Sequence, residues 1–545
     1  MVSQFAQTEK HSIEHPVRER LLGRLLEDRA SQYGNRQFLD FKGVQRISYQ
    51  EFNEAANRFA NGLLALGLGK EQKLAVMLPN CPEYLYLLFG AAKIGAVTVP
   101  INTAYKGDLL RQLLNNSDAE LLVVAEEYIV TINEIACTLG GLKTLLIHSD
   151  QSVSRTDLPH HWQVINLDVL YEASTGKPQS DVRHTDTVMI LYTGGTTGPS
   201  KGVVMTHHFY YFYAYLVKQS IGYTEDDISY TCMPLFHINA QIGSIVSVLY
   251  AGAQVALYQR FSARTFWDEI RASGTTVFLG MGAVGNILAK KPTTPVDSDN
   301  RVRLAVIVPP PEDLEGFERR FGLRVIYETF GMTEGLIIPP KLYEPRRRGC
   351  CGKPIEDYEV RIVDDDDLPL GPHQTGELVF RPRAPYTMMS GYYKMPEATL
   401  EAFRNLWFHT GDLGYFDEDG FLYYVGRKKD AIRRRGEIIS AYEIESVINQ
   451  HPSVLESAAI AVPSELGEDE VKIVAQLKPA AELGPEELIR FCEPRMAYFM
   501  VPRYVEFREA LPKNPSQRIE KYKLRAEGIT ELTWDRLKAG VELKR

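Results

Sequence analysis

Apolar residues at helical spacing alternate with short apolar runs along the stretch from about residue 21 to residue 308. Helical spacing holds over residues 51–66 and 82–92, and each of these segments is followed by a short apolar run, at 73–77 and at 97–101. Parallel strands need long crossover connections, which are usually helices. The alternation therefore predicts an α/β fold with parallel sheets covered by helices.

A small β-barrel subdomain is predicted over about residues 349–425, where the helical spacing fades. Short β-rich runs, for example at 360–363 and 376–381, alternate there with turns rich in glycine and proline. Together with the helix-covered sheets before it, we expect this subdomain to complete a large N-terminal domain over residues 1–427.

The charged segment GRKKD at residues 426–430 separates this domain from a smaller α+β unit. A helical pattern over 441–450 and two strand patterns follow the charged segment. We therefore expect a hinge at 428–430 and a mobile C-terminal domain over 431–545.

Composition and charge limit the classes of function. The chain of 545 residues is too long for a single core, and its 44% hydrophobic and 24% charged residues are ordinary for a soluble globular protein. The sequence has no long uncharged apolar run and no signal-peptide pattern, so we predict no transmembrane segment and a cytoplasmic location. The formal net charge of -9 gives no electrostatic support for a nucleic-acid partner.

The six cysteines are scattered along the chain without any CxxC pair. This spacing argues against a disulfide framework and against a zinc site. We therefore expect the cysteines to be buried thiols.

The segment ILYTGGTTGPSKG at residues 190–202 is an apolar strand that runs into a loop of glycine, threonine and serine with one lysine. Glycines let backbone N–H groups approach an anion, the hydroxyls add donors and the lysine adds charge. The loop is not a Walker A motif, because Lys201 precedes Gly202 rather than Ser or Thr. By itself, the stretch fits both a phosphate cradle and a plain turn between a strand and a helix. The candidate phosphate-binding residues are Thr193, Gly194, Gly195, Thr196, Thr197, Gly198 and Lys201.

Three further segments follow this loop: ETFGMTEG from residue 328, HTGDLGYFDEDGFLYYVGRKKD from 409 and LPKNPSQRIEKYKLR from 511. With the loop, they resemble the adenylate-forming enzymes, which include acyl-CoA synthetases, beetle luciferases and nonribosomal-peptide adenylation domains. The resemblance extends from about residue 21 to residue 525. It implies a carboxylate–CoA ligase whose partners are a small-molecule carboxylic acid, ATP with Mg²⁺, and coenzyme A. The acid and ATP form an acyl-adenylate and pyrophosphate, and CoA then takes the acyl group and releases AMP.

The FGMTE sequence carries three candidate residues of the adenylation step. Phe330 can stack on a base, Thr333 can hydrogen-bond an α-phosphate, and Glu334 can hold Mg²⁺. Core packing explains Phe330 equally well. The resemblance implies that Thr333 contacts the adenylate and that Glu334 is the metal ligand.

The segment from residue 409 carries the candidates for binding the nucleoside. A carboxylate suits a diol, and the resemblance implies that Asp412 accepts hydrogen bonds from both ribose hydroxyls. An Asx turn within Thr-Gly-Asp is the alternative explanation of Asp412. Tyr424 and Arg427 are similar to the family's nucleotide-contacting aromatic residue and ribose-binding arginine.

The resemblance places Lys429 at the family's hinge residue. The C-terminal domain is expected to rotate about it between an adenylating and a thioester-forming arrangement. We expect the flanking Lys428 and Asp430 to face solvent. Gly436 resembles a glycine whose backbone lies along the pantetheine tunnel, and a simple β-turn is its alternative explanation.

His237, in MPLFHINAQ, matches a histidine of the acyl-CoA synthetases near the acyl pocket. We expect residues 237–243 and 280–285 to line part of that pocket. A lone histidine in an apolar stretch is more often a satisfied core residue. The preceding Pro-Leu-Phe favours the functional interpretation.

The sequence departs from the family at residue 518. The family usually has a lysine there, which bridges the carboxylate and the ATP phosphates during adenylation. Arg518 keeps the positive charge, but its planar fork differs in shape and direction from an ammonium group. Three possibilities stay open. Arg518 acts in place of the lysine, or Lys521 or Lys513 reaches the phosphates instead, or the first half-reaction is specialised or weakened. We favour the first possibility.

Two other functions stay open beside the ligase. One is a weakened or non-catalytic nucleotide-binding homologue, which Arg518 supports and which the intact Glu334, Asp412 and Arg427 argue against. The other is an adenylation enzyme that loads a separate carrier protein. Several segments, among them YTCMPLFHINAQ, look most similar to the crotonobetaine/carnitine–CoA ligase branch. A homodimer also stays open as the oligomeric state.

Overall fold

The structure is a computed structural model, and it describes residues 13–149, 158–193, 200–308, 310–311, 313–327, 329–342, 346–347, 349–430, 432–434, 437–439, 441–463, 469–514 and 518–543. The chain divides into two compact units. The first unit holds the chain up to residue 193 together with residues 201–346 and 384–396. The second unit holds residues 347–383 and the chain from residue 397 on.

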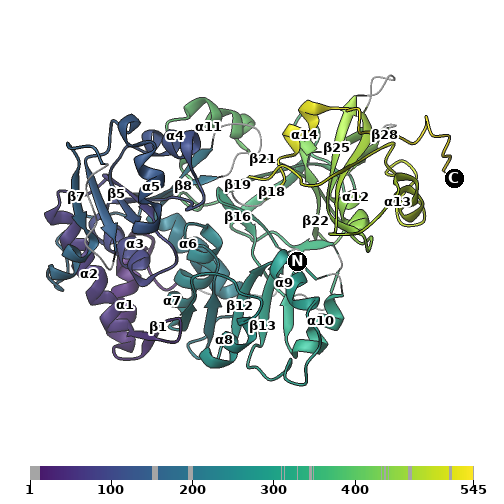
Figure 1. Cartoon of the computed structure of the whole chain (residues 1–545). Helices are drawn as coiled ribbons and strands as arrows, with labels where there is room; N and C mark the ends of the chain where they lie inside the picture. Colours follow the sequence, from purple (N-terminus) through teal and green to yellow (C-terminus); the bar gives the residue numbers. More distant parts are fainter. Residues whose placement is uncertain are drawn as a thin grey trace, which may run out of the picture. The chain divides into compact units, whose positions relative to one another are not determined.

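The larger sheet of the first unit has eight strands (Figure 1). In sheet order they are β20 (Gly391–Tyr392), β9 (Lys201–Thr206), β8 (Thr187–Thr193), β4 (Val97–Pro100), β3 (Lys73–Met77), β5 (Ala119–Ala125), β6 (Thr144–His148) and β7 (Gln163–Asn166). From β8 to β7 every neighbouring pair is parallel, whereas β9 and β20 add an antiparallel edge. Strand β4 is buried at every position, as expected for a parallel strand covered on both faces.

The second sheet of the first unit has seven strands. In sheet order they are β14 (Arg324–Ile326), β13 (Leu304–Val308), β12 (Val277–Met281), β10 (Ile228–Thr231), β11 (Gln254–Leu257), β1 (Gln37–Phe41) and β2 (Gln45–Ser48). All pairs are parallel except β1 with β2. The prediction of parallel sheets in an α/β fold is confirmed.

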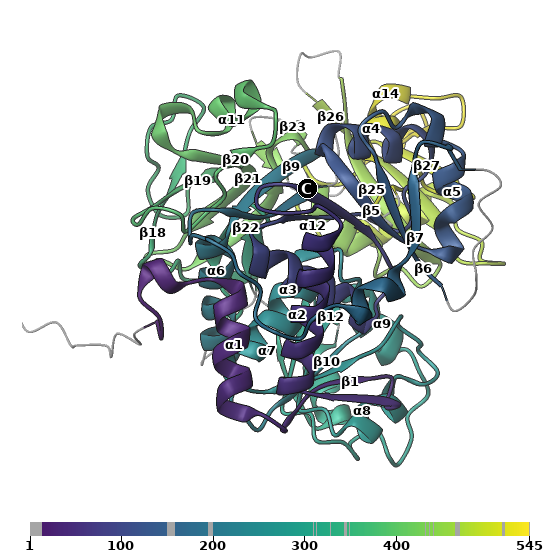
Figure 2. The same ribbon diagram turned by 90° about the vertical axis from the view of Figure 1, so that its left-hand side faces the viewer.

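Helices pack against these two sheets. They are α1 (Leu22–Tyr33), α2 (Tyr49–Ala65), α3 (Pro82–Ile94), α4 (Gly107–Ser117), α5 (Ile129–Asn133), α6 (His207–Ile221), the π-helix η5 (Asn239–Val246), α7 (Ser247–Ala251), α8 (Phe266–Ser273), α9 (Gly282–Ala289) and α10 (Leu314–Phe321). Helices α1, α2 and α3 lie side by side (Figures 1 and 2). A capping box starts α2: the Ser48 hydroxyl accepts from the Glu51 N–H, and the Glu51 carboxylate accepts from the Ser48 N–H.

The second unit begins with a five-stranded antiparallel sheet. In sheet order its strands are β17 (Cys350–Gly352), β22 (Leu422–Arg427), β21 (Phe408–Phe416), β19 (Gly376–Pro382) and β18 (Tyr358–Val363). This sheet occupies the region predicted as a small β-barrel subdomain. Strands β17 and β18 are its edges, so its ladder does not close into a ring among the described residues.

The rest of the second unit is α+β, as predicted. It contains the hairpin β23 (Ile432–Arg434) with β24 (Glu437–Ile439), the sheet β25 (Val454–Pro463), β26 (Asp469–Leu477), β27 (Tyr504–Arg508) and β28 (Trp534–Asp535), and the helices α12 (Ala441–Ile448), α13 (Pro485–Cys492) and α14 (Lys521–Glu527). An apolar cluster joins Ile444 of α12, Ile473 of β26 and Leu488 of α13. Both sides of the predicted hinge lie in this unit, and the division at 428–430 stays a prediction.

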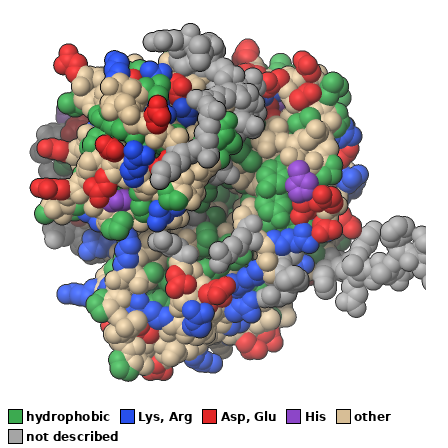
Figure 3. All heavy atoms as spheres, turned by 90° about the vertical axis from the view of Figure 1, so that its right-hand side faces the viewer, with side chains coloured by type: hydrophobic (Ala, Val, Ile, Leu, Met, Phe, Trp, Pro, Cys, Tyr) green, Lys and Arg blue, Asp and Glu red, His purple; other side chains and the backbone are tan. Residues whose placement is uncertain are grey.

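The surface carries charges of both signs. Figure 3 shows acidic, basic and hydrophobic side chains interspersed over one face. None of the described helices has the length and the apolar composition that crossing a bilayer requires.

The cysteines differ in exposure. Cys81, Cys350 and Cys492 are buried thiols, as predicted, but Cys137 is exposed. It lies in the short 3-10 turn η3 (Ala136–Thr138) rather than in a helix or strand that faces a core. The prediction of buried thiols is therefore wrong for Cys137.

Candidate active site

Strands β8 and β9 form a hairpin whose connection is the loop rich in glycine and threonine. Thr193 and Lys201 face each other across it, and Thr193 Oγ1 donates a hydrogen bond to the Lys201 carbonyl oxygen at 3.4 Å. The ends of the loop are therefore held together, and they join two strands rather than a strand and a helix. The other candidates of this loop lie outside the described residues: Gly194, Gly195, Thr196, Thr197 and Gly198.

Tyr392 connects two of the predicted site residues, Lys201 and Glu334. The Lys201 ammonium lies 4.7 Å from the centre of the Tyr392 ring, and the Tyr392 hydroxyl donates to Glu334 Oε1 at 2.9 Å. The pairing of β20 with β9 sets Tyr392 opposite Val203 and so places it there. Sequence reasoning missed Tyr392, because its own segment, GYYK, does not say which strand it pairs with.

Glu334 lies in the turn between β15 (Phe330–Met332) and β16 (Gly335–Ile338) and is only 7% exposed. Burial, and then the negative charge of Glu334, raise the pKa of the nearby Tyr213 hydroxyl. Mg²⁺ prefers oxygen ligands, carboxylates among them, so Glu334 suits the metal role. Thr333 is partly exposed in the same turn, whereas Phe330 is largely buried, which agrees with core packing for that ring.

Asp412, Tyr424 and Arg427 come together through the hairpin of β21 and β22. The register places Asp412 opposite Arg427, and the Arg427 Nε lies 2.9 Å from Asp412 Oδ1. The Tyr424 hydroxyl donates to the same oxygen at 3.4 Å. Burial, and then the charge of Asp412, raise the pKa of Tyr424. Asp412 thus accepts a hydrogen bond from the opposite strand and forms an ion pair with it, which the Asx-turn explanation did not include.

Two glycines of the HTGDLG sequence allow this hairpin to form. Gly411 has a φ of +69°, in the left-handed region that favours glycine. A Cβ at Gly414 would lie 2.7 Å from the Tyr423 carbonyl oxygen of the partner strand. The motif therefore sets the backbone geometry as well as the side chains of this part of the site.

A cavity of about 200 Å³ in the second unit borders this group. Its lining includes Tyr424, Arg427 and Asp430 together with Glu445 and Lys521. Lys521 Nζ lies 2.6 Å from Glu445 Oε1. Burial raises the pKa of Glu445, although the charge of Lys521 opposes that effect. The cavity therefore offers both signs of charge beside the predicted nucleoside-binding residues.

The predicted hinge lies in the 3-10 turn η7 (Lys428–Asp430). Lys428 does not simply face solvent as expected, because its Nζ lies 3.0 Å from Glu377 Oε2 and 3.2 Å from Asp365 Oδ1. Asp430 forms an ion pair with Arg525 of α14, which also donates to the Lys429 carbonyl oxygen. Lys428 and Asp430, the two neighbours of Lys429, are therefore both ion-paired. Gly436 lies outside the described residues.

Arg518 is hydrogen-bonded to Asn514 of the C-terminal segment. Its backbone N–H donates to Asn514 Oδ1 at 3.0 Å, and its carbonyl oxygen accepts from the Asn514 N–H at 2.9 Å. The Arg518 residue is exposed. Of the three candidate cations, Lys513 is paired with Glu456 at 2.8 Å and Lys521 with Glu445, whereas the described residues contain no ion pair of Arg518.

His237 is exposed in the turn before η5, so it is not a satisfied core residue. Asn80 holds the segment before it, because Asn80 Nδ2 donates to the Met233 carbonyl oxygen at 2.9 Å and its Oδ1 accepts from the Leu235 N–H at 2.8 Å. The π-helical turn that follows is rare in proteins and is frequent at functional sites.

The two segments predicted to line the acyl pocket are neighbours. A Cβ at Gly243, in η5, would lie 2.5 Å from Leu279 Cδ2 of β12, so the backbone there approaches the strand closely. Residues 280–285 continue from this strand into α9. The structure therefore brings these segments together, while their role toward an acyl group stays a prediction.

Comparisons with known proteins agree with this geometry. Residues 26–393 match the AMP-binding enzyme family, and residues 443–518 match the AMP-binding enzyme C-terminal domain. A crotonobetaine/carnitine–CoA ligase of Salmonella typhi is 33% identical over 514 residues, which cover 92% of this chain and 98% of the relative.

Two solved structures show the same fold. ATP-bound MatB from Rhodopseudomonas palustris superposes with a TM-score of 0.81 at 26% identity, covering 93% of this chain and 98% of that one. O-succinylbenzoate coenzyme A synthetase (MenE) from Bacillus subtilis, in complex with AMP, gives a TM-score of 0.77 at 26% identity. It covers 93% of this chain and 99% of that structure.

Proposed function

Because this chain belongs to the family of AMP-binding enzymes, we propose how its own residues carry out ATP-dependent carboxylate–CoA ligation. A carboxylate oxygen attacks the α-phosphorus of ATP, pyrophosphate leaves and an acyl-adenylate forms. The CoA thiolate then attacks the acyl carbon, and AMP leaves with the former carboxylate oxygen. The observation that carries the assignment of roles is the series of contacts from Lys201 through Tyr392 to the buried Glu334.

The first unit supplies the groups for the phosphates and the metal. Glu334 would hold Mg²⁺, which would neutralise phosphate charge. Tyr392 keeps the Glu334 carboxylate oriented, and Lys201 and Thr193 flank the loop that receives the phosphates. Thr333, in the same turn as Glu334, donates to the adenylate. Charges that develop on the phosphates during the displacement are thereby opposed by groups already in place.

The second unit supplies the groups for the nucleoside. Asp412 accepts from the ribose hydroxyls, and Arg427 and Tyr424 contact the nucleotide from the cavity that they line. The hydrogen bond from Tyr424 to Asp412 is long, at 3.4 Å, and therefore weak. A ribose hydroxyl can replace it at Asp412 with a smaller loss of free energy than it could replace a short hydrogen bond. Replacing Asp412 with Asn should raise the KM for ATP and leave the fold intact, because the two side chains have the same shape.

Arg518 supplies the cation that opposes charge during adenylation. Its support is the absence of an ion pair among the described residues, whereas Lys513 and Lys521 are each paired with a glutamate. The test is pyrophosphate exchange by Arg518→Ala and Arg518→Lys, with Lys513→Ala as the matched control. We expect Arg518→Ala to lose about 10²-fold or more, a typical effect of removing one transition-state partner. Full exchange by Arg518→Ala would remove Arg518 from the reaction.

The acid is proposed to be a small carboxylic acid of the betaine type. The support is the relative named crotonobetaine/carnitine–CoA ligase, together with the exposed His237 at the predicted acyl pocket. A panel of betaine-type, short, medium-chain and aromatic acids, scored by AMP release with and without CoA, tests this assignment. Nucleotide binding without acid-dependent AMP release would establish a non-catalytic homologue. AMP release that no CoA accelerates would point to a separate carrier protein.

Three further assignments complete the proposal: the hinge, the location and the oligomeric state. Rotation about Lys429 switches the enzyme from adenylation to thioester formation, with Gly436 beside the pantetheine arm of CoA. The cytoplasmic location rests on the use of ATP and CoA as co-substrates, and cell fractionation tests it. The homodimer stays a prediction that light scattering of the purified chain decides.

A further inference from the structure

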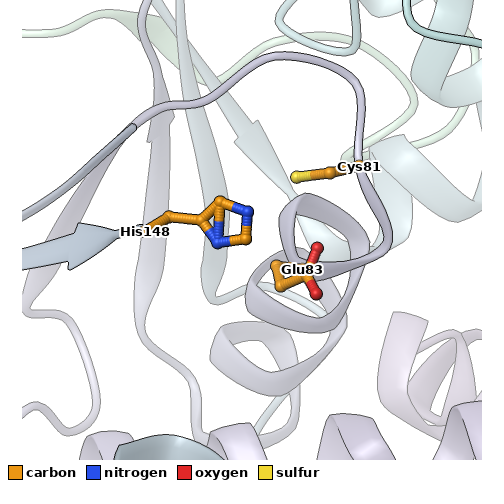
Figure 4. A group of neighbouring side chains, drawn as sticks. All are labelled: Cys81, Glu83 and His148. Atoms are coloured by element: carbon orange, nitrogen blue, oxygen red, sulfur yellow. The ribbon is translucent and has the colours of Figure 1, made fainter. Parts of the chain in front are cut away.

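A thiol, a carboxylate and an imidazole that are not among the residues assigned to ligation meet at one edge of the eight-stranded sheet. Cys81 Sγ, a Glu83 carboxylate oxygen and a His148 ring nitrogen all lie within 4.8 Å of one another. Figure 4 shows these side chains as neighbours, from the residue before α3, the first turn of α3 and the end of β6. None of the three has a role in the reaction described above.

The topology of the sheet explains this meeting. Strands β3, β5 and β6 are parallel neighbours, so their carboxyl ends share one edge. His148 is the last residue of β6, and Cys81 follows the end of β3 by four residues. The spacing of these residues in the sequence does not predict the group, because its members lie at the ends of two strands, β3 and β6, that are separated by β5.

The surroundings of the group suit a bound cation. The Tyr171 hydroxyl donates to Glu83 Oε1 at 2.7 Å and orients the carboxylate. Among the ion pairs of the described residues, none involves Glu83. The start of α3 favours a negative charge at Glu83, and the Cys81 thiol hydrogen-bonds to that carboxylate, but neither accounts for the imidazole beside them. Cys81 is 4% exposed, whereas Glu83 and His148 are partly exposed, so an ion can enter from solvent.

We propose that Cys81, Glu83 and His148 form a Zn²⁺ site with water as the fourth ligand. Sulfur, imidazole nitrogen and carboxylate oxygen are the zinc ligands of proteins, and a thiolate does not suit Mg²⁺ or Ca²⁺. Tetrahedral zinc with bonds of about 2.0–2.3 Å needs its ligand atoms roughly 3.2–3.7 Å apart, so small side-chain movements close the site. Binding releases the Cys81 thiol proton to water.

The site stiffens a loop that also supports the predicted acyl pocket. Asn80, next to Cys81, holds the Met233 and Leu235 backbone before His237 and also donates to the Tyr258 carbonyl oxygen at 3.0 Å. The phosphate loop begins at the end of β8, which is four strands from β6 in the same sheet. At about 4.8 Å a strand, that is roughly 19 Å of sheet width for His148 and roughly 10 Å for Cys81, which follows β3, two strands from β8. The proposed zinc ligands are therefore a different set of residues from Glu334, the proposed Mg²⁺ ligand.

The experiment uses the full chain after treatment with a chelator. Co²⁺ replaces Zn²⁺ as a spectroscopic probe, because a thiolate bound to cobalt gives a charge-transfer band that carboxylate and imidazole ligands do not give. We expect one equivalent of Co²⁺ to produce this band and one equivalent of Zn²⁺ to abolish it. Cys81→Ser should lose the band, and His148→Gln should weaken the affinity at least tenfold. Cys137→Ser, which changes an exposed cysteine of the same unit, is the matched control and should keep the band.

Tyr171→Phe gives a second readout that does not disturb any ligand. Loss of an outer-shell hydrogen bond typically costs about 10–100-fold in metal affinity, so Zn²⁺ binding should weaken by that factor. An unchanged band in Cys81→Ser, or a chain that binds no equivalent of either metal, would overturn the site. Pyrophosphate exchange with Mg²⁺, measured on the chelated chain, reports separately on the ligase, so that failure of one proposal is distinguished from failure of the other.

Discussion

At the scale of single residues, Tyr392 contacts both Lys201 and Glu334. Its ring faces the Lys201 ammonium and its hydroxyl donates to Glu334. Tyr392→Phe keeps the ring and removes only the donor. Hydrogen bonds to charged groups contribute about 1.5–3 kcal/mol, so we expect the Mg²⁺ concentration for half-maximal pyrophosphate exchange to rise about tenfold or more.

The neighbouring Tyr393 provides the matched control for this prediction. Its hydroxyl donates to Asp118 Oδ2 at 2.7 Å, on a side chain other than Glu334. Tyr393→Phe should leave the Mg²⁺ titration unchanged. If Tyr392→Phe and Tyr393→Phe shift the titration equally, Tyr392 does not position the metal ligand.

At the scale of elements, the hairpin of β21 and β22 depends on Gly414. A Cβ there would lie 2.7 Å from the Tyr423 carbonyl oxygen, so Gly414→Ala must push the two strands apart. We expect a loss of about 1–3 kcal/mol in the free energy of unfolding, the usual cost of overpacking, as measured by urea denaturation. Gly484→Ala is the control, because a Cβ at Gly484 meets no atom within 4 Å. Equal stability of the two variants would contradict the role of Gly414.

The turn η7 is the second element whose behaviour is predicted. Proline fixes φ near -65° and removes the backbone N–H, so Lys429→Pro should hinder rotation at the proposed hinge. We expect thioester formation from a supplied acyl-adenylate to fall much more than pyrophosphate exchange. Lys429→Ala, which leaves the backbone free, should change both rates little. A similar fall in the two half-reactions of Lys429→Pro would argue against a hinge at this residue.

At the scale of the whole molecule, acid should weaken the fold through buried groups that respond over different pH ranges. Burial lowers the pKa of His207, in the first unit, from 6.5 to about 4. In the unfolded chain the His207 imidazole is therefore protonated near pH 6.5, whereas in the folded chain it is protonated only near pH 4. The stability of the fold falls as the pH drops through this range. The shift corresponds to roughly 3 kcal/mol.

Glu506, in the second unit, responds at lower pH. Burial alone would raise its pKa, but hydrogen bonds from Lys472, Thr533, Thr530 and Arg508 lower it from 4.5 to about 2. Its contribution is present above pH 4.5 and is lost as the pH falls toward 2. Thermal unfolding from pH 7 to pH 2 tests both ranges. His207→Gln should reduce the loss of stability between pH 6.5 and 4 and leave the loss below pH 4 unchanged. The exposed His161→Gln should change neither. Equal slopes of stability against pH in these two variants would contradict the assignment.

Much of the fold was predictable, because periodicity and turn chemistry are local. The predicted helix at 51–66 is α2 and the predicted strand at 73–77 is β3, with ends within two residues. Asp412 was identified from its motif, and its hairpin partner Arg427 lies only fifteen residues away, so the pair forms within one supersecondary unit. The roles of these residues toward ATP stay predictions.

By itself, the sequence determined the family, the α/β class and the candidate chemistry of Glu334 and Asp412, because these depend on residue type and short spacing. Only the tertiary structure decided that Tyr392 joins Lys201 to Glu334, that Lys428 is ion-paired, and that Cys81, Glu83 and His148 meet despite a spacing that argued against zinc. The physical reason is sheet order and register. Which strands become neighbours follows from burying whole faces against one another, and no local pattern of residues carries that information.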